Sequence, residues 1–251
     1  MIHTQQLTRQ FGDFTAVDNL ELVVRPGELY GFLGMNGAGK TTTMRMLVGL
    51  LKPTTGQVRI AGYDIQEEPL EAKRRFGYLA QTPFVYDNLT GYEFLHFLGG
   101  LHRLDEADIT ERIDRWLPLL KLTEKAGQLI GSYSGGMRRK VALAGALLHQ
   151  PDVLILDEPF AGLDPLSARH VKDALQQQAD AGNTILISSH TLEIVERVCS
   201  RIGILRRGKL IAEGTLDELR ADSDGTLEDI FLELNAESQG NASVVSLVDA
   251  L

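Results

Sequence analysis

One short loop motif constrains this chain more than any other feature of its sequence. Residues 34–41 have the sequence Gly-Met-Asn-Gly-Ala-Gly-Lys-Thr, which matches the pattern G-x-x-x-x-G-K-[ST]. Residues 29–33 before the loop predict a strand, and residues 42–51 after it predict a helix, because apolar side chains recur there at helical spacing. A strand, a glycine-rich loop and a helix in this order favour a phosphate-binding loop over an accidental glycine-rich turn.

The residue types of the loop predict a phosphate ligand. Glycine allows the backbone angles and the close approach by which N–H groups surround phosphate oxygens. The Lys40 ammonium supplies positive charge for the terminal phosphates, and the Thr41 hydroxyl is suited to Mg²⁺. We expect nucleotide contacts from the whole loop and the start of the helix, namely Gly34, Met35, Asn36, Gly37, Ala38, Gly39, Lys40, Thr41 and Thr42.

Length and charge narrow the class of protein. A chain of 251 residues predicts one domain, or one domain with a subdomain. The net charge of -9 argues against nucleic acid as the main partner. No apolar run reaches the ~18 residues of a membrane span, so any membrane role requires a partner. The single cysteine, Cys199, has apolar neighbours and is interpreted as a buried thiol in a reducing cytosol.

The pattern of apolar residues divides the chain into strand-rich and helical parts. Short β-like runs at residues 2–7 and 16–24 open the sequence. Residues 90–120 have helical spacing without strand-like runs, which indicates a helical insertion. The runs at residues 153–156 and 184–187 have apolar side chains on successive residues, as expected for parallel strands that are buried on both faces.

Polar groups follow the predicted buried strands at the points where those strands end. In an open parallel α/β sheet, ligands bind beyond the carboxyl ends of the strands. If the strands share one sheet, these groups reach the same edge as the phosphates. They are the loop after residues 29–33, Gln81 after residues 76–79, Asp157 and Glu158 after residues 153–156, and His190 after residues 184–187.

Hydrolysis of a phosphoanhydride would give each of these side chains a role. Asp157 is placed to hold Mg²⁺, directly or through water, and Glu158 to orient or deprotonate the attacking water. Gln81 can contact both metal and water, and His190 can donate to the γ-phosphate. Two plainer interpretations stay open: Asp157-Glu158-Pro159 as a helix-capping turn, and His190 as an ordinary polar turn residue.

A second glycine-containing segment precedes a long helical run. Residues 133–137 read Tyr-Ser-Gly-Gly-Met, and Ser134, Gly135 and Gly136 stand at the predicted helix start. Exposed N–H groups, the positive end of the helix dipole and a hydroxyl make such a start a phosphate-binding feature. By itself this is weak, because Ser-Gly-Gly is common in turns.

Taken together, the motifs resemble those of the ATP-binding subunits of ABC transporters, over roughly residues 2–235. The matching motifs occur in the family's order: the Walker A loop at 34–41, the Q-loop glutamine Gln81, the signature motif at 133–137, Walker B at 153–157 with the catalytic Glu158, the D-loop at 161–164, and the switch histidine His190.

The resemblance implies a fold and a set of ligands. The fold would be a P-loop NTPase core with a parallel sheet, a small N-terminal antiparallel β subdomain and a helical insertion. Residues 1–235 would form the ATPase domain, with the helical subdomain at about 84–145, and residues 236–251 a tail. ATP and Mg²⁺ would bind, with Thr41, Gln81 and Asp157 at the metal. Phe11 stands where the family places an aromatic that stacks on adenine, although it could also be a core residue.

The resemblance also implies partners. Two ATPase chains, either two identical copies or this chain with a related one, would pair head to tail, with Ser134, Gly135 and Gly136 of one completing the ATP site of the other and Asp164 at the seam. Residues 83–86 and the helical insertion would dock on a membrane permease, which would hold the chain at the cytoplasmic face of the membrane.

Departures from the usual signature indicate a subgroup. Tyr133 replaces leucine and Met137 replaces glutamine, which is similar to export-type ATPases, as is the stretch at 227–234. The main alternative is a soluble ABC-type ATPase acting on a ribosome or DNA-repair complex. Such relatives usually carry tandem ATPase units or a long coiled coil, whereas this chain has one loop motif and no extended heptads. A kinase or GTPase switch would lack the signature and the D-loop.

Overall fold

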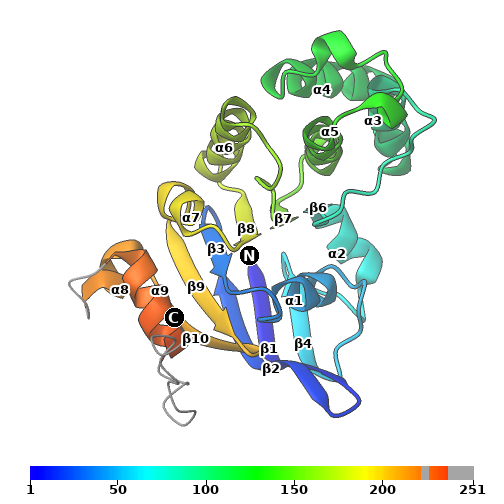
Figure 1. Ribbon diagram of the computed structural model, residues 1–251. Helices are drawn as coiled ribbons and strands as arrows, with labels where there is room; N and C mark the ends of the chain where they lie inside the picture. The colour runs from blue at the N-terminus through cyan, green and yellow to red at the C-terminus, as the bar shows by residue number, and fades with distance from the viewer. Residues whose placement is uncertain (222–225, 237–251) are drawn as a thin grey trace.

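The protein is described by a computed structural model that covers residues 1–221 and 226–236. The predicted tail beyond residue 236 lies outside these described residues. Two β-sheets and the helices around them make up the fold (Figure 1).

A six-stranded sheet contains all four strands that were predicted to carry polar groups. Its order is β10-β9-β3-β8-β7-β6, and all neighbours pair in parallel except β9 and β10. Every residue of β3, β7 and β8 is buried, which explains why apolar residues follow one another at 153–156 and 185–187. The strands are β3 (Leu29–Leu33), β6 (Phe76–Leu79), β7 (Val153–Asp157), β8 (Thr184–Ser189), β9 (Arg201–Arg206) and β10 (Lys209–Gly214).

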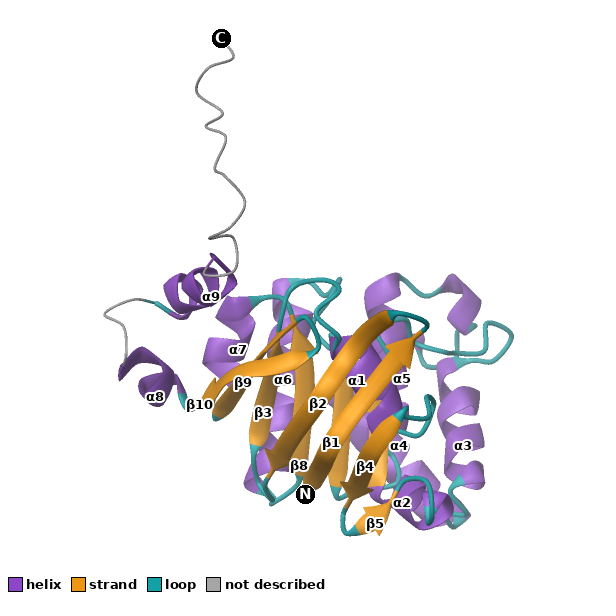
Figure 2. Cartoon of the chain, turned by 90° about the horizontal axis from the view of Figure 1, so that it is seen from below, coloured by secondary structure: helices purple, strands orange, loops and turns teal. Residues whose placement is uncertain are grey.

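The N-terminal strands form a separate antiparallel sheet, as predicted. Its order is β2-β1-β4-β5, and buried and exposed side chains alternate along much of β2 and β4. Figure 2 shows this sheet lying over the parallel sheet, with α1 (Lys40–Leu47) beside them. Apolar side chains of both sheets and of α1 share one core cluster. The strands are β1 (Ile2–Phe11), β2 (Phe14–Val24), β4 (Thr55–Ile60) and β5 (Tyr63–Asp64).

Helices cover the other face of the parallel sheet and form a group beyond its β6 edge. In Figure 1, α3, α4 and α5 lie together away from the antiparallel sheet, in the region predicted as a helical insertion. Their buried side chains, including Phe94, Ile113 and Trp116, join a second core cluster that also contains residues of β7 and β8. The helices are α2 (Pro69–Arg75), α3 (Gly91–Leu101), α4 (Glu106–Leu119), α5 (Gly135–Leu147), α6 (Pro165–Asp180), α7 (Leu192–Val198), α8 (Leu216–Ala221) and α9 (Leu227–Ala236), with 3₁₀ turns at Thr123–Lys125 and Ile130–Ser132.

The helix after the loop motif differs from its predicted span of 42–51. It begins two residues earlier, at Lys40, and ends at Leu47. Gly49 has a φ of 71°, a left-handed conformation that commonly ends helices, and the Leu50 and Leu51 N–H groups both bond the Arg45 carbonyl. The apolar spacing therefore continued past the point where the glycine ends the helix.

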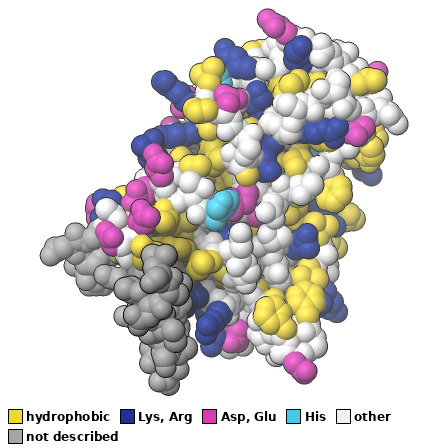
Figure 3. Space-filling view, in the orientation of Figure 1, with side chains coloured by type: hydrophobic (Ala, Val, Ile, Leu, Met, Phe, Trp, Pro, Cys, Tyr) yellow, Lys and Arg dark blue, Asp and Glu magenta, His cyan; other side chains and the backbone are white. Residues whose placement is uncertain are grey.

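Within the described ranges, none of the helices has an apolar stretch long enough to cross a membrane. Figure 3 shows basic and acidic side chains interspersed over one face of the molecule.

Candidate functional site

The loop between β3 and α1 is held in a shape that requires glycine. Gly39 has a φ of 111°, and a Cβ atom there would lie 2.5 Å from the carbonyl oxygen of Ala16 on β2. The Gly208 N–H, from the β9–β10 turn, donates to the Ala38 carbonyl at 2.8 Å. The loop is thus braced by both sheets. No side chain among the described residues caps α1, so its first N–H groups stay available to an anion.

Lys40 is buried against the loop that carries it. Its Nζ donates to the carbonyl oxygens of Gly34 at 2.6 Å and Met35 at 3.3 Å. Burial lowers the pKa of the Lys40 ammonium, while the carboxylates of Glu158 and Asp157 act in the opposite direction. The cation is therefore positioned on the loop before any ligand arrives.

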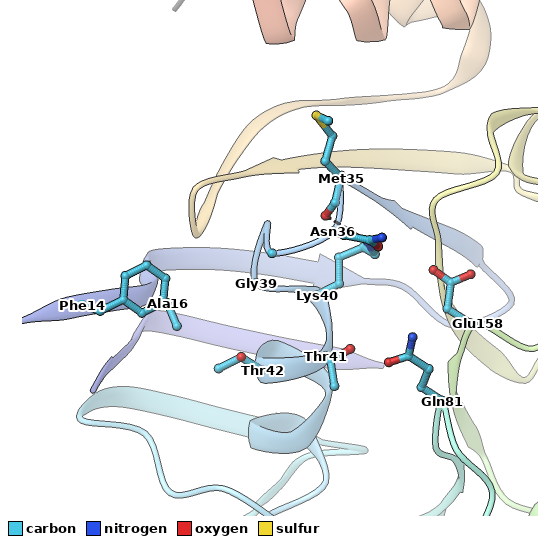
Figure 4. Close-up of a pocket in the computed structure, with 11 residues that line it drawn as sticks. Phe14, Ala16, Met35, Asn36, Gly39, Lys40, Thr41, Thr42, Gln81 and Glu158 are labelled. Carbon is cyan, nitrogen blue, oxygen red and sulfur yellow. Dashed lines mark hydrogen bonds between the residues drawn. The ribbon is translucent and has the colours of Figure 1, made fainter. Parts of the chain in front are cut away.

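A cavity of about 390 Å³ lies over the loop. Figure 4 shows Phe14 and Ala16 at one end, Lys40 and Thr41 near the middle, and Gln81 and Glu158 at the other end. The cavity is elongated, with a hydrophobic end and a polar end on either side of the glycine-rich loop. The residues that line it are Phe14, Ala16, Met35, Asn36, Gly37, Gly39, Lys40, Thr41, Thr42, Gln81 and Glu158.

Glu158 directly follows β7, and its side chain contacts His190. Its side chain is only 8% exposed, and its Oε1 lies 2.8 Å from His190 Nδ1. Because a carboxylate only accepts, Nδ1 is the donor. Glu158 also has a φ of 54°, a conformation that non-glycine residues seldom adopt and that often marks functional sites. The Glu158 N–H is anchored by the Ser188 carbonyl at 3.2 Å and the Ser188 hydroxyl at 3.1 Å.

Asp157 offers a buried oxygen that suits a cation. Its Oδ1 accepts a hydrogen bond from the Ser188 hydroxyl, whereas its buried Oδ2 has no hydrogen-bond partner within the described chain. An unpaired buried carboxylate oxygen is costly, and carboxylate oxygens are ligands that Mg²⁺ prefers. The site therefore fits the predicted metal, with Asp157 at the end of β7 and Thr41 and Gln81 on the cavity wall.

Other predicted residues lie outside the cavity lining. Gly34 and Ala38 belong to the loop but pack inward, against each other and Leu205. Ser134 caps α5, its side chain accepting from the Met137 N–H at 3.3 Å, and none of Ser134, Gly135 and Gly136 lines the cavity.

The cavity wall carries Phe14 rather than Phe11. Phe11 and Phe14 are paired positions at the β1–β2 turn, and β2 is the strand whose Ala16 lies against the loop. Phe11 is 46% exposed, so its alternative interpretation as a core residue is wrong. The Arg9 guanidinium lies 4.5 Å from the centre of the Phe11 ring.

Sequence reasoning missed several residues that shape the site. Phe14 and Ala16 gave no signal, because nothing in the sequence places β2 beside the loop. Ser188 could have been found from its position at the end of β8, two residues before His190. Arg139 reads as a surface residue of a helix, yet it is 9% exposed and donates to the carbonyl oxygens of Glu158 and Gln81.

This geometry allows one reaction class in particular. The loop and Lys40 can hold a polyphosphate, and the buried carboxylate at its far end can act on a water molecule. The family model described as ABC transporter matches residues 17–161, more than half of the chain. The chain belongs to the ABC transporter family.

Relatives of this ABC family member include proteins that are named for drug transport. It is 39% identical over 240 residues to a probable multidrug ABC transporter ATP-binding protein, YbhF, of Escherichia coli, covering 93% of this chain and 41% of the relative. It is 40% identical over 232 residues to the bacitracin transport ATP-binding protein BcrA of Bacillus licheniformis, covering 91% of this chain and 74% of the relative. This chain therefore spans less than half of the length of the first relative.

Solved structures agree with the ABC ATPase fold. An ATP-binding subunit of an ABC transporter superposes with a TM-score of 0.89 at 32% identity, covering 94% of this chain and 99% of that one. A bacterial ABC transporter cassette, whose structure is dimeric, superposes with a TM-score of 0.79 at 25% identity, covering 86% and 98%. The predicted fold of the ABC ATPase is confirmed.

Proposed function

We propose that this chain binds ATP and Mg²⁺, hydrolyses the ATP between two copies of itself, and thereby powers a separate membrane permease for export. The observation that carries the proposal is the convergence of Lys40, Gln81 and Glu158 on one cavity, with the Asp157 carboxylate and His190 next to it. Export is favoured by the names of the relatives, and pairing by the dimeric cassette.

Each side chain has a step in this mechanism. Lys40 and the loop N–H groups would hold the terminal phosphates, and Thr41, Gln81 and Asp157 would hold the metal. Magnesium, when bound, would offset negative charge on the phosphate oxygens. Glu158 orients the attacking water and accepts its proton. His190 donates Nδ1–H to Glu158, and its other ring nitrogen, Nε2, would contact the γ-phosphate.

A second copy would complete the ATP site. Ser134, Gly135 and Gly136 stand at the start of α5 and outside the cavity, where they would contact the ATP of a partner and not their own. Asp164, the cap of α6, would lie at the seam. The base would stack on an aromatic side chain of the β1–β2 turn, with Phe11 the residue that the family resemblance implies and Phe14 the one nearer the loop.

A second groove provides a surface for the permease. It has a volume of about 590 Å³ and is lined by Ala80, which precedes Gln81, by the Pro83–Tyr86 stretch and by α3. Phe84 is 89% exposed, and Tyr86 packs edge-on against Phe97 with ring centres 5.7 Å apart. A short cytoplasmic helix of a permease would bury these rings, as helices do in apolar grooves. This docking would place the chain at the inner face of the cell membrane.

We expect Phe84→Ala combined with Tyr86→Ala to abolish co-purification of the permease from detergent-solubilised membranes. Because these side chains are exposed, the ATPase activity of the isolated chain should stay unchanged. Leu232→Ala, which removes a side chain that is 57% exposed on α9, is the matched control and should retain the permease. Normal assembly and transport in the double variant would contradict the proposal that this groove docks the permease. Capture of ribosomes in place of a membrane protein would favour a soluble ABC-type ATPase instead.

A further inference from the structure

Arg139 links the helix that follows the signature segment to two residues of the cavity. It lies on α5, five residues after Ser134, and is 9% exposed. Its Nη1 donates to the Glu158 carbonyl at 2.5 Å, and its Nη2 donates to the Gln81 carbonyl at 2.6 Å. One planar guanidinium therefore bonds the backbone of both polar residues at the far end of the cavity.

The backbone of Glu158 depends on such anchors. Its positive φ is disfavoured for a residue with a side chain, so the surroundings must hold it. Ser188 bonds the N–H of Glu158, and Arg139 bonds its carbonyl. With both sides of the residue anchored, the backbone position from which its carboxylate projects is fixed.

The two hydrogen bonds of the Arg139 guanidinium also constrain the distance between the segment that carries Gln81 and the segment that carries Glu158. Gln81 follows β6 and Glu158 follows β7, and these neighbouring strands end at the same sheet edge. Guanidinium donors have a rigid planar geometry, unlike the flexible ammonium of lysine. Burial lowers the pKa of the Arg139 guanidinium, and the carboxylates of Glu158 and Asp157 counter this shift.

The helix connects this fork to the signature segment. Ser134 caps α5, and Arg139 lies on the same helix little more than one turn later. The next residue, Lys140, reaches toward the D-loop side, with its Nζ 3.4 Å from the Ser167 hydroxyl, which in turn donates to Asp164 at 2.6 Å. A shift at the start of α5 would therefore be passed on in two directions. Arg139 would carry it to Glu158 and Gln81, and Lys140 would carry it through Ser167 to Asp164.

We propose that Arg139 is a positioning residue for hydrolysis, which holds Glu158 and Gln81 in register and ties them to the signature helix of the same copy. In the proposed dimer, ATP bound to a partner and contacted by Ser134 would thus influence the carboxylate that acts on the other ATP. The inference rests on the proposed role of Glu158, so it is tested separately from that role.

The test compares Arg139→Gln and Arg139→Lys with the full-length wild type. We expect Arg139→Gln to lower kcat by about 10- to 100-fold, because small misplacements of catalytic groups have effects of this size. ATP affinity, measured by titration, should change by less than about threefold, since Arg139 does not line the cavity. Lysine keeps the positive charge and N–H donors but not the planar fork, so it should restore only part of kcat, and it gives a second result if the glutamine variant folds poorly.

Arg112→Gln is the matched control. Arg112 is a half-buried arginine of α4 whose Nη1 also donates to a backbone carbonyl, that of Leu148, at 3.1 Å. We expect this variant to lose a similar amount of thermal stability and to keep its kcat. An equal fall of kcat in both variants, or a fall that follows only the folded fraction, would overturn the proposal.

A double-variant cycle separates this inference from the proposed function. If Arg139 acts through Glu158, adding Arg139→Gln to Glu158→Gln should reduce the residual turnover by less than about twofold. A full additional loss would show that Arg139 acts elsewhere. Wild-type turnover in Glu158→Gln alone would contradict the proposed function instead, and normal turnover in Arg139→Gln beside an inactive Glu158→Gln would contradict only the positioning role.

Discussion

Glu158→Gln is expected to lower ATP turnover by about 10²- to 10⁴-fold, the usual contribution of a general base. Glutamine has nearly the same shape and can still accept from His190, so the local structure should persist. It cannot take a proton from water. ATP should therefore stay bound, and the variant should accumulate as an ATP-dependent dimer, which phosphate release and light-scattering mass would detect.

The control for this variant is a carboxylate outside the site. Glu71 lies on α2, forms an exposed ion pair with Arg74, and does not line the cavity. Glu71→Gln should turn over ATP at the wild-type rate and stay monomeric under the same conditions. Turnover near the wild-type level in Glu158→Gln would contradict the role of Glu158 as the general base. A monomer that holds ATP without hydrolysing it would contradict the proposal that ATP is bound between two copies.

Lys40→Ala is expected to weaken nucleotide binding by about 10- to 100-fold. A hydrogen bond to a charged group contributes roughly 1.5–3 kcal/mol, and the variant loses such bonds to the terminal phosphates. The loss should be larger for ATP than for ADP, because the lysine contact is with the terminal phosphates. Titration of both nucleotides at constant ionic strength would measure it.

The matched control for this prediction is Lys52→Ala. Lys52 is an exposed lysine that does not line the cavity, so its removal changes the net charge equally without touching the loop. Circular dichroism would show that both variants are folded. An affinity in Lys40→Ala that equals that of the control would contradict the assignment of the loop as the phosphate site.

Buried parallel strands were the most readable part of the sequence. The runs at 29–33, 76–79, 153–156 and 184–187 are neighbours in one sheet, and they could be recognised because strands covered on both faces have apolar side chains on successive residues. Their shared edge then brought together the polar groups that follow them. The contact between His190 and Glu158 was foreseeable to this extent, as two groups on one rim.

Contacts between distant segments were not readable. Phe14 reaches the cavity through the way one sheet lies on the other, which no local pattern encodes. Arg139 sits in a run of three cations, and such runs usually face solvent, yet the turn of the helix directs it inward. The end of α1 was predicted at residue 51 because the apolar spacing continues that far. The helix ends at Leu47, and Gly49 in the sequence could have indicated this.

The hydrogen bonds of Lys40 to its own loop bear on how tightly a nucleotide can be held. Before binding, the ammonium already has two acceptors, in Gly34 and Met35. An arriving phosphate must displace these internal competitors, so the net gain is the difference between two sets of charged hydrogen bonds. When the product leaves, the Lys40 ammonium can again donate to these two carbonyl oxygens, so it is not left buried without a hydrogen-bond acceptor. The loop thus moderates affinity at both ends of the cycle, which suits a protein that must release what it has cleaved.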